Sequence, residues 1–318
     1  MIQRFLLALM ATALAAPAAA AARAPAACTA SGQSNLTFES DFRGDSKQFD
    51  AAMSYRPGYR WYRWNWFNVR PDPSRAQIVG GALTVREPGG GFSGHVTSAA
   101  LSVKAPGFVG TAFGGGACVE VKLRFVPDRL RSAPGHPSFW SMSIEHLANR
   151  GADRWPGKPA NYSHFLEWDI FEYFKVPEPG FLSSWIDWFG SYVGEGTPRT
   201  WFGGCERPYC KNPGSFKAKP GAVPESTDWR QWQTIIGLWV PATGTNPGYI
   251  QTFFNGRAIA PPKYWPGANT TVKNDSDLLN FSWIDRQHQV FVISSGAVPM
   301  QVQSVRVWQK TTKYNLSN

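Results

Sequence analysis

The sequence has few of the residues and patterns that build metal centres and helical proteins. Its 318 residues include five histidines and four cysteines, and the histidines are scattered without the spacing that metal ligands share. Helical periodicity is nearly absent from the chain. We therefore expect no metal site, no required cofactor and a fold built of strands.

Long hydrophobic runs and dense basic tracts are also scarce. Beyond the N-terminus no apolar run is long enough to span a bilayer, so we expect no membrane span. The formal net charge of +10 would suit an acidic polysaccharide, a membrane surface or a nucleic acid. Because Lys and Arg form no dense tract, the sequence favours a solvated basic surface and no nucleic-acid partner. We expect the chain to be a monomer.

The first 22 residues are typical of a secretory signal. Arg4 supplies the positive end, Phe5–Ala16 the apolar run, and the Ala tract that follows a small-residue cleavage site. A transmembrane anchor is the alternative, but the Leu-rich run is short and ends in Pro and Ala. A lipoprotein signal ending at Cys28 would lack the usual Leu. We expect residues 1–22 to be removed, residues 23–318 to form one domain, and the protein to be secreted or periplasmic.

Export would place the four cysteines in an oxidising compartment. Cys205 and Cys210 lie in CERPYC, inside a segment rich in Gly and Pro, where a local disulfide would fit. That pairing leaves Cys28 with Cys118, which would tie the mature N-terminus to a strand. Other pairings stay open from the sequence.

The chain contains many short runs rich in Val, Ile, Phe and Trp, broken by Gly and Pro. In Ala117–Val126 apolar and charged residues alternate, which predicts a strand with one buried face. Asn255-Gly256 predicts a hairpin turn within Tyr249–Ile259. Further expected strands are Gln77–Arg86, His95–Val103, Trp232–Val240, His288–Ala297 and Val302–Gln309. The pattern predicts an all-β, two-sheet sandwich.

One apolar run, HFLEWDIFEYF, carries three acids. In a strand, Glu167 and Asp169 share one face, and Leu166, Trp168 and Ile170 share the other. Strict alternation would bury Glu172 unpaired, at a high cost in free energy. A single β-bulge at Ile170–Phe171 would return Glu172 to the face of the other two acids.

A row of three carboxyls has a specific chemical use. Retaining glycoside hydrolysis needs two carboxyl groups about 5–5.5 Å apart, one ionised and one protonated. A flat strand would hold Glu167 and Glu172 too far apart, so the strand must curve toward the acids. Asp169 between them would raise the proton affinity of a neighbouring carboxyl and could orient the nucleophile. A charged face in contact with solvent is the alternative interpretation.

The segment EWDIFE resembles the active-site motif of glycoside hydrolase family 16, in the bulged form of laminarinase-like and agarase-like members. Weaker similarities flank it and extend from Phe38 to Gln309. They lie in SRAQIVGGALTVRE, FSGHVTSAALSV, GGGACVEVKLRF, GHPSFWSMS, WQTIIGLWVPATGTNPGYIQTFFNGRAI and QVQSVRVWQ. Trp168 departs from the family pattern, which usually has an aliphatic residue there.

The resemblance implies a concanavalin A-like β-jelly roll whose concave sheet forms an open sugar cleft. It implies a glycoside hydrolase that cleaves a β-linked polysaccharide internally and with retention, either a β-1,3 or mixed-linkage glucan or a galactan. By position, Glu167 matches the nucleophile, Asp169 the orienting acid and Glu172 the general acid/base. Members of the family often hold a structural calcium ion, to which the sequence assigns no ligands.

Sugar rings stack on aromatic faces, so a glycan cleft should contain some of the 15 tryptophans. Trp140 lies in the segment that resembles the approach to the active site. Trp64 belongs to the dense aromatic run WYRWNWFN, and Trp185 follows the acidic motif. We expect these three to bind substrate, although packing in the core is the alternative for each. Glu145 and His146 are expected on the surface.

Three other functions stay open from the sequence. A transglycosylase would use the same acids with a sugar as acceptor. A carbohydrate-binding protein on the same sandwich would have lost catalysis, although it would gain nothing from three acids at this spacing. A polysaccharide lyase would suit the positive charge, but it needs a Tyr, His or Lys base near Arg or Asn, and no such group is evident.

Overall fold

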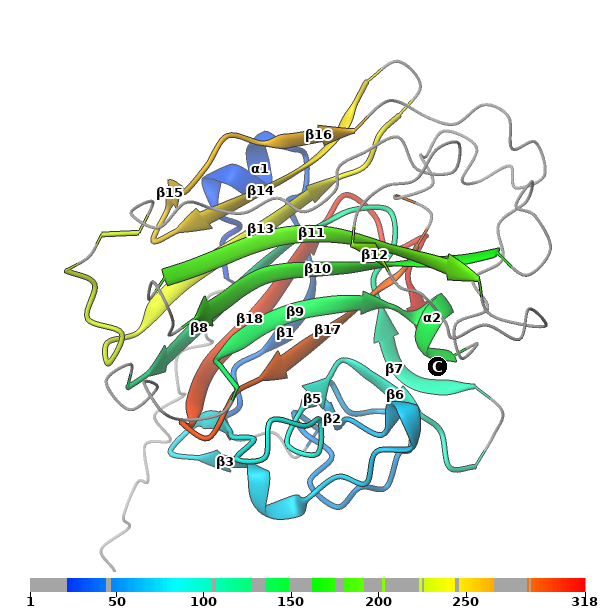
Figure 1. Ribbon diagram of the computed structural model, residues 1–318. Helices are drawn as coiled ribbons and strands as arrows, with labels where there is room; N and C mark the ends of the chain where they lie inside the picture. The colour runs from blue at the N-terminus through cyan, green and yellow to red at the C-terminus, as the bar shows by residue number, and fades with distance from the viewer. Residues whose placement is uncertain are drawn as a thin grey trace, which may run out of the picture.

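The computed structural model describes residues 22–43, 47–104, 107–126, 135–148, 162–174, 180–191, 202–203, 223–224, 226–243, 246–265, 285 and 287–317. Antiparallel strands make up most of this part of the chain (Figure 1), which confirms the all-β class. The short helical segments described are α1 (Ala26–Ala30), α2 (Ile144–Ala148) and the 3-10 turns η1 (Trp66–Asn68) and η2 (Pro73–Arg75). Neither described α-helix has the length and apolar character needed to cross a membrane.

The larger sheet has nine strands within the described residues. In spatial order its main path is β15 (Arg257–Ala258), β14 (Gly248–Phe254), β13 (Gln233–Val240), β8 (Ala117–Phe125), β18 (Met300–Gln309), β4 (Ala82–Val85) and β3 (Ala76–Val79). Two more strands pair beside this path, β1 (Asn35–Ser40) with β18 and β16 (Lys263–Trp265) with β14.

A second sheet of seven described strands packs against the first. Its spatial order is β12 (Phe202–Gly203), β11 (Gly180–Ser191), β10 (Tyr162–Phe174), β9 (Ser138–Ser143), β17 (Gln289–Ser294), β5 (Val96–Thr97) and β2 (Tyr62–Arg63). A third sheet, which the sequence did not predict, consists of β19 (Leu316–Ser317), β7 (Phe108–Ala112) and β6 (Ala99–Leu101). Figure 1 shows β9, β10 and β11 running side by side as long ribbons.

The main core lies between the two large sheets, as alternation along the strands requires. On β8 the residues Val119, Val121 and Leu123 are fully buried, while the polar residues between them are only partly covered. They meet Trp168 and Ile170 from β10 in one cluster. The alternation read from Ala117–Val126 therefore identifies the inward face of β8 correctly.

Two expected single strands are each divided in the structure. Gln77–Arg86 is a hairpin, β3 and β4, because Gly80 and Gly81 both take positive φ angles, +59° and +74°, that turn the chain back. His95–Val103 changes sheets between β5, in the seven-stranded sheet, and β6, in the small one. The expected hairpin at Asn255-Gly256 is confirmed between β14 and β15.

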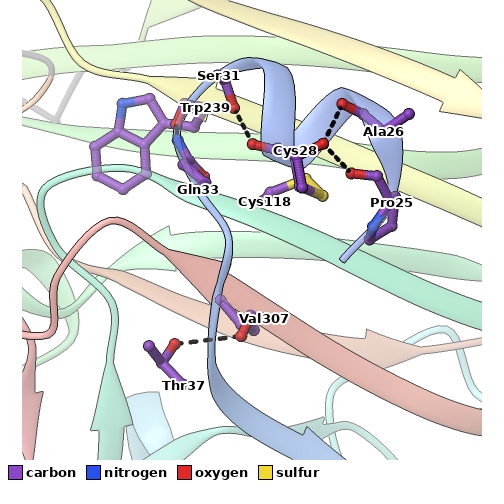
Figure 2. The surroundings of a disulfide bond; sticks show 10 residues. Pro25, Ala26, Cys28, Ser31, Gln33, Thr37, Cys118, Trp239 and Val307 are labelled. Atoms are coloured by element: carbon purple, nitrogen blue, oxygen red, sulfur yellow. Dashed lines mark hydrogen bonds between the residues drawn. A yellow bond between two sulfur atoms is a disulfide. The ribbon is translucent and has the colours of Figure 1, made fainter. Parts of the chain in front are cut away.

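A disulfide joins Cys28 on α1 to Cys118 on β8 (Figure 2), with 5.5 Å between the Cα atoms. Both cysteines are fully buried, in a cluster with Ile236, Leu238 and Trp308. These side chains lie on the face of the larger sheet that points away from the main core, so the bridge fastens α1 over this outer face. The expected Cys28–Cys118 pairing is confirmed, whereas Cys205 and Cys210 lie outside the described residues.

Replacing Cys28 and Cys118 together by alanine should destabilise the protein strongly. The bridge closes a loop with a sequence separation of 90 residues. Removing it restores chain entropy to the unfolded state and should cost about 4 kcal/mol, which lowers Tm by about 10 °C. Thermal unfolding followed by circular dichroism measures the shift. An unchanged Tm would mean that the bridge does not constrain the unfolded chain.

Candidate active site

The central feature of the site is a β-bulge in β10. Against β9, the register advances from Asp169↔Trp140 to Glu172↔Ser138, so three steps on β10 correspond to two on β9. The pairing with β11 shifts within the same stretch, between Asp169 and Glu172. The bulge predicted at Ile170–Phe171 is therefore present. Ile170 and Phe171 both point into the main core and are fully buried.

A glycine in the facing sheet makes room for the side chains behind the bulge. A Cβ atom added to Gly237 on β13 would lie 2.8 Å from Trp168 Cζ2 and 2.8 Å from Ile170 Cγ2. Such contacts are shorter than van der Waals distance. The bulky Trp168 is thus accommodated by the missing side chain at Gly237, which the sequence of β10 alone does not reveal.

The bulge brings Glu167, Asp169 and Glu172 to one face, where all three line a cleft of about 240 Å³. Asp169 is 2% exposed and Glu172 17% exposed, so these carboxyls are largely screened from bulk water. The cleft is also lined by residues of β9, β17 and two loops, namely Gly90, Gly91, Phe92, His95, Gly135, His136, Ser138, Trp140, Met142, Ser294 and Ser295.

The floor of the cleft is set by register across β10, β9 and β17. Glu167 stands opposite Met142, Asp169 opposite Trp140, and Glu172 opposite Ser138. Ser138 in turn pairs with Ser294 on β17. Ser294 Oγ accepts a hydrogen bond of 2.9 Å from Trp140 Nε1 and contacts Ser138 Oγ at 2.6 Å. These bonds fix the indole of Trp140 beside the acids.

Glu172 has a histidine partner at the end of the row. Its Oε1 lies 3.1 Å from Nε2 of His136, in the loop that leads into β9. The His136 side chain is 29% exposed, so the pair is partly shielded from solvent. A hydrogen bond between partly buried groups holds a carboxyl more firmly than one on an open surface.

One wall of the cleft is the loop 87–95, which carries Phe92 and His95. The loop is organised by Glu87, whose carboxyl is 1% exposed and ion-paired with Arg75. Glu87 Oε2 also accepts hydrogen bonds from the backbone N–H of Gly94 at 2.6 Å and from Ser93 Oγ at 3.0 Å. The buried carboxylate thus fixes the chain directly after Phe92.

Replacing Arg75 by alanine should weaken both the fold and the cleft wall. The change leaves the carboxylate of Glu87 buried without its cation. Because Arg75 is itself partly exposed, we expect a moderate loss of stability, about 2 kcal/mol. We expect Tm to fall by about 5 °C and the loop 87–95 to become easier for a protease to cut. Calorimetry and limited proteolysis measure these effects. Replacing the neighbouring exposed Arg86 by alanine is the control and should leave both unchanged.

His95 contributes a neutral ring to the cleft. Burial lowers the pKa of His95 to about 3, and the charge of His136 adds to this shift. The imidazole is therefore uncharged at neutral pH. Its Nδ1 atom is buried and has no hydrogen-bond partner among the described residues. His95 can offer hydrogen bonding to a ligand without adding charge beside the acids.

The three expected substrate-binding tryptophans lie in different places. Trp140 lines the cleft. Trp64 is fully buried and stacks on Phe92, which is 39% exposed and lines the cleft, with 5.5 Å between ring centroids. Trp64 thus supports the ring that a ligand would meet. Trp185 lies opposite Trp168 in the register of β11 and β10, and its side chain lies outside the described part of the structure.

The expectation that Glu145 and His146 lie on the surface is wrong for His146, and Glu145 is only partly exposed. His146 is 8% exposed and packs against Phe67, with 5.7 Å between ring centroids. Glu145 pairs with Nδ1 of His288 and accepts a 3.2 Å hydrogen bond from its backbone N–H. Helix α2 turns these side chains toward the protein directly after β9. No group of metal-ligating residues suited to an ion occurs within the described residues.

The residues that sequence reasoning missed come from the two loops. His136 lies in GHPSFWSMS, a segment already connected with the active site, but its place beside Glu172 depends on the pairing of β9 with β10. Phe92 and His95 lie in a glycine-rich stretch without periodicity. An aromatic residue directly after a run of glycines was the one signal that could have drawn attention to this wall.

No protein-family model matches the chain, and no curated protein matches it. Among solved structures it is similar to the endo-1,3-β-glucanase from Streptomyces sioyaensis, at 16% identity over 89% of this chain and 97% of that one, with a TM-score of 0.43. LamA of Zobellia galactanivorans, in complex with laminaritriose and laminaritetraose, is similar at 14% identity over 86% and 99%, with a TM-score of 0.40.

A pseudo β-1,3-glucanase of Mycobacterium tuberculosis, described as an immunostimulatory antigen, is similar at 13% identity. The match covers 86% of this chain and 99% of that one, with a TM-score of 0.40. All three likenesses extend along most of the chain and are distant.

Proposed function

We propose that the protein is an exported, retaining endo-β-glycosidase that hydrolyses a β-linked polysaccharide. The observation that carries the proposal is that Glu167, Asp169 and Glu172 line one cleft. Two carboxyl groups on either side of a sugar bond are the chemical requirement of glycoside hydrolysis. A row of acids that only faced solvent would not require a bulge that turns Glu172 to the face of the other two acids, nor a buried Asp169.

The proposed reaction is a double displacement. Glu167 attacks the anomeric carbon, while Glu172 donates its proton to the oxygen of the departing sugar. Water then attacks the glycosyl-enzyme bond, gives its proton to Glu172 and releases the product with its original anomeric configuration. Asp169 orients Glu167 and, as a neighbouring negative charge, favours a proton on another carboxyl of the row. Neither a metal nor an organic cofactor is needed in these steps.

The substrate we propose is a β-1,3 or mixed-linkage glucan, with a galactan as the alternative. The choice rests on the resemblance of EWDIFE to the family 16 motif. The cleft supports a sugar ligand in general, because Phe92 and Trp140 offer apolar surface beside hydroxyl and imidazole groups. Export is supported by the predicted leader and by the Cys28–Cys118 disulfide, which suits an oxidising compartment.

A glycan panel tests this proposal. Purified mature protein is incubated with laminarin, mixed-linkage β-glucan, agarose and carrageenan, and reducing ends and product masses are measured. We expect one of these to give oligosaccharides of several sizes early in the reaction, as internal cleavage does. Proton NMR of the first products should show the β-anomer, because two displacements restore the configuration.

Other outcomes would replace the proposal. Products longer than the substrate would indicate a transglycosylase that uses the same acids. Binding without turnover on every glycan would indicate a carbohydrate-binding protein. An α-anomer as first product would contradict the double displacement. Unsaturated products that absorb ultraviolet light would indicate a lyase.

A further inference from the structure

The contact between Glu172 and His136 has a property that the reaction steps do not use. His136 Nε2 lies 3.1 Å from Oε1 of Glu172, so one of the two carboxyl oxygens already has a partner before any ligand binds. Both residues line the cleft, and His136 comes from a different segment, the loop before β9. The histidine thus limits how the carboxyl can rotate.

The charged and titratable groups that line the cleft with this pair are Glu167 and Asp169 on β10 and His95 on the loop 87–95. His95 is neutral, since burial lowers its pKa to about 3. A carboxyl beside two other acids would otherwise be free to turn either oxygen toward them. His136 is therefore the neighbour best placed to select one orientation of Glu172.

We infer that His136 is a positioning residue that holds Oε1 of Glu172 and leaves Oε2 to exchange the proton with substrate. This inference rests on the proposed function. When Glu172 is ionised it can only accept, so Nε2 of His136 carries the hydrogen and donates it to Oε1. The acid proton then sits on Oε2, passes to the glycosidic oxygen, and is replaced by a proton from the attacking water. The proton of His136 stays in place throughout.

The dependence of kcat/KM on the leaving group distinguishes a loss of positioning at Glu172 from a general distortion of the site. In a dinitrophenyl β-glycoside of the sugar cleaved in the panel, the dinitrophenolate leaves without being protonated. The leaving sugar of the polysaccharide must receive a proton from the acid. We expect His136→Leu to lower kcat/KM on the polysaccharide by about 30-fold and on the dinitrophenyl glycoside by less than about 3-fold. His136→Gln keeps an N–H of similar reach and should recover much of the loss.

The chain offers a matched control in His288, which pairs with Glu145 and does not line the cleft. His288→Gln should leave kcat/KM on both substrates unchanged. Equal losses of His136→Leu on the two substrates, or no loss, would overturn the inference. Glu172→Ala calibrates the assay: if it shows no preference for the activated substrate, the acid/base assignment of Glu172 fails instead.

A second measurement does not depend on turnover. The urea midpoints of wild type, His136→Leu, Glu172→Gln and the double variant form a cycle in which residues in contact give non-additive effects. We expect each substitution to lower the urea midpoint less when the other substitution is already present. Strictly additive midpoints would mean that the two side chains do not interact in solution, and this would overturn the inference even if no glycan were cleaved.

Discussion

Glu167→Gln and Glu172→Gln should each abolish glycan hydrolysis in practical terms while leaving the fold intact. An amide cannot form the glycosyl-enzyme bond, so Glu167→Gln should lower kcat by about 10⁵-fold. Glu172→Gln removes the proton donor and should lower kcat by about 10³-fold on the polysaccharide. Reducing-end release on the glycan identified by the panel measures both losses, and circular dichroism checks the fold.

Asp169→Asn and Glu145→Gln complete this series. Asp169 is buried between the other two acids, and its amide should orient Glu167 less well, with a smaller loss of about 10²-fold. Glu145 is a carboxyl outside the cleft, so Glu145→Gln should keep wild-type kcat. Full activity of Glu167→Gln on the same glycan would remove the double displacement from consideration, whatever the other variants do.

Gly237→Ala should reduce activity strongly although it lies in the opposite sheet. Its added methyl group would lie 2.8 Å from both Trp168 and Ile170, so β10 must move at the bulge that aims the acids. Overpacking of this kind costs about 2 kcal/mol, and a shift near 1 Å at the reacting groups can cost about 10²-fold in rate. Unfolding in urea and kcat on the glycan measure the two effects.

Two further variants show whether the loss comes from packing. Gly89→Ala adds the same methyl group where the closest atom is 3.7 Å away, and it should leave the urea midpoint unchanged. Trp168→Leu in the Gly237→Ala chain removes one of the two close contacts and should restore part of the activity. If Gly237→Ala lowers stability but leaves kcat unchanged, the packing behind the bulge does not position the acids.

The acidic strand was the most predictable part of the molecule. Period-two alternation together with the cost of burying Glu172 was enough to place a bulge at Ile170–Phe171, and the register confirms it. The Asn255-Gly256 turn and the Cys28–Cys118 bridge were also predicted. The bulge follows from the two faces of one strand and the turn from one dipeptide. The bridge follows from the small number of cysteines that can pair.

One failure is local, and the others involve contacts between segments distant in sequence. Gln77–Arg86 looks continuous in hydrophobicity, and the positive φ angles of Gly80 and Gly81 divide it. His136 meets Glu172 through the pairing of two strands, and Gly237 accommodates Trp168 across the core. Hydrophobic pattern reports which face of a strand is buried, but it does not report which partner covers that face.

The position of the disulfide also decides what happens to the molecule after a proteolytic cut. Cys28 and Cys118 enclose the loop 87–95 within one covalent ring. A single peptide-bond cleavage by a protease at Gly90 or Gly91 would leave two fragments still joined through sulfur. The nicked molecule would keep Phe92 and His95 attached, so a cut visible on a reducing gel would be silent on a non-reducing one.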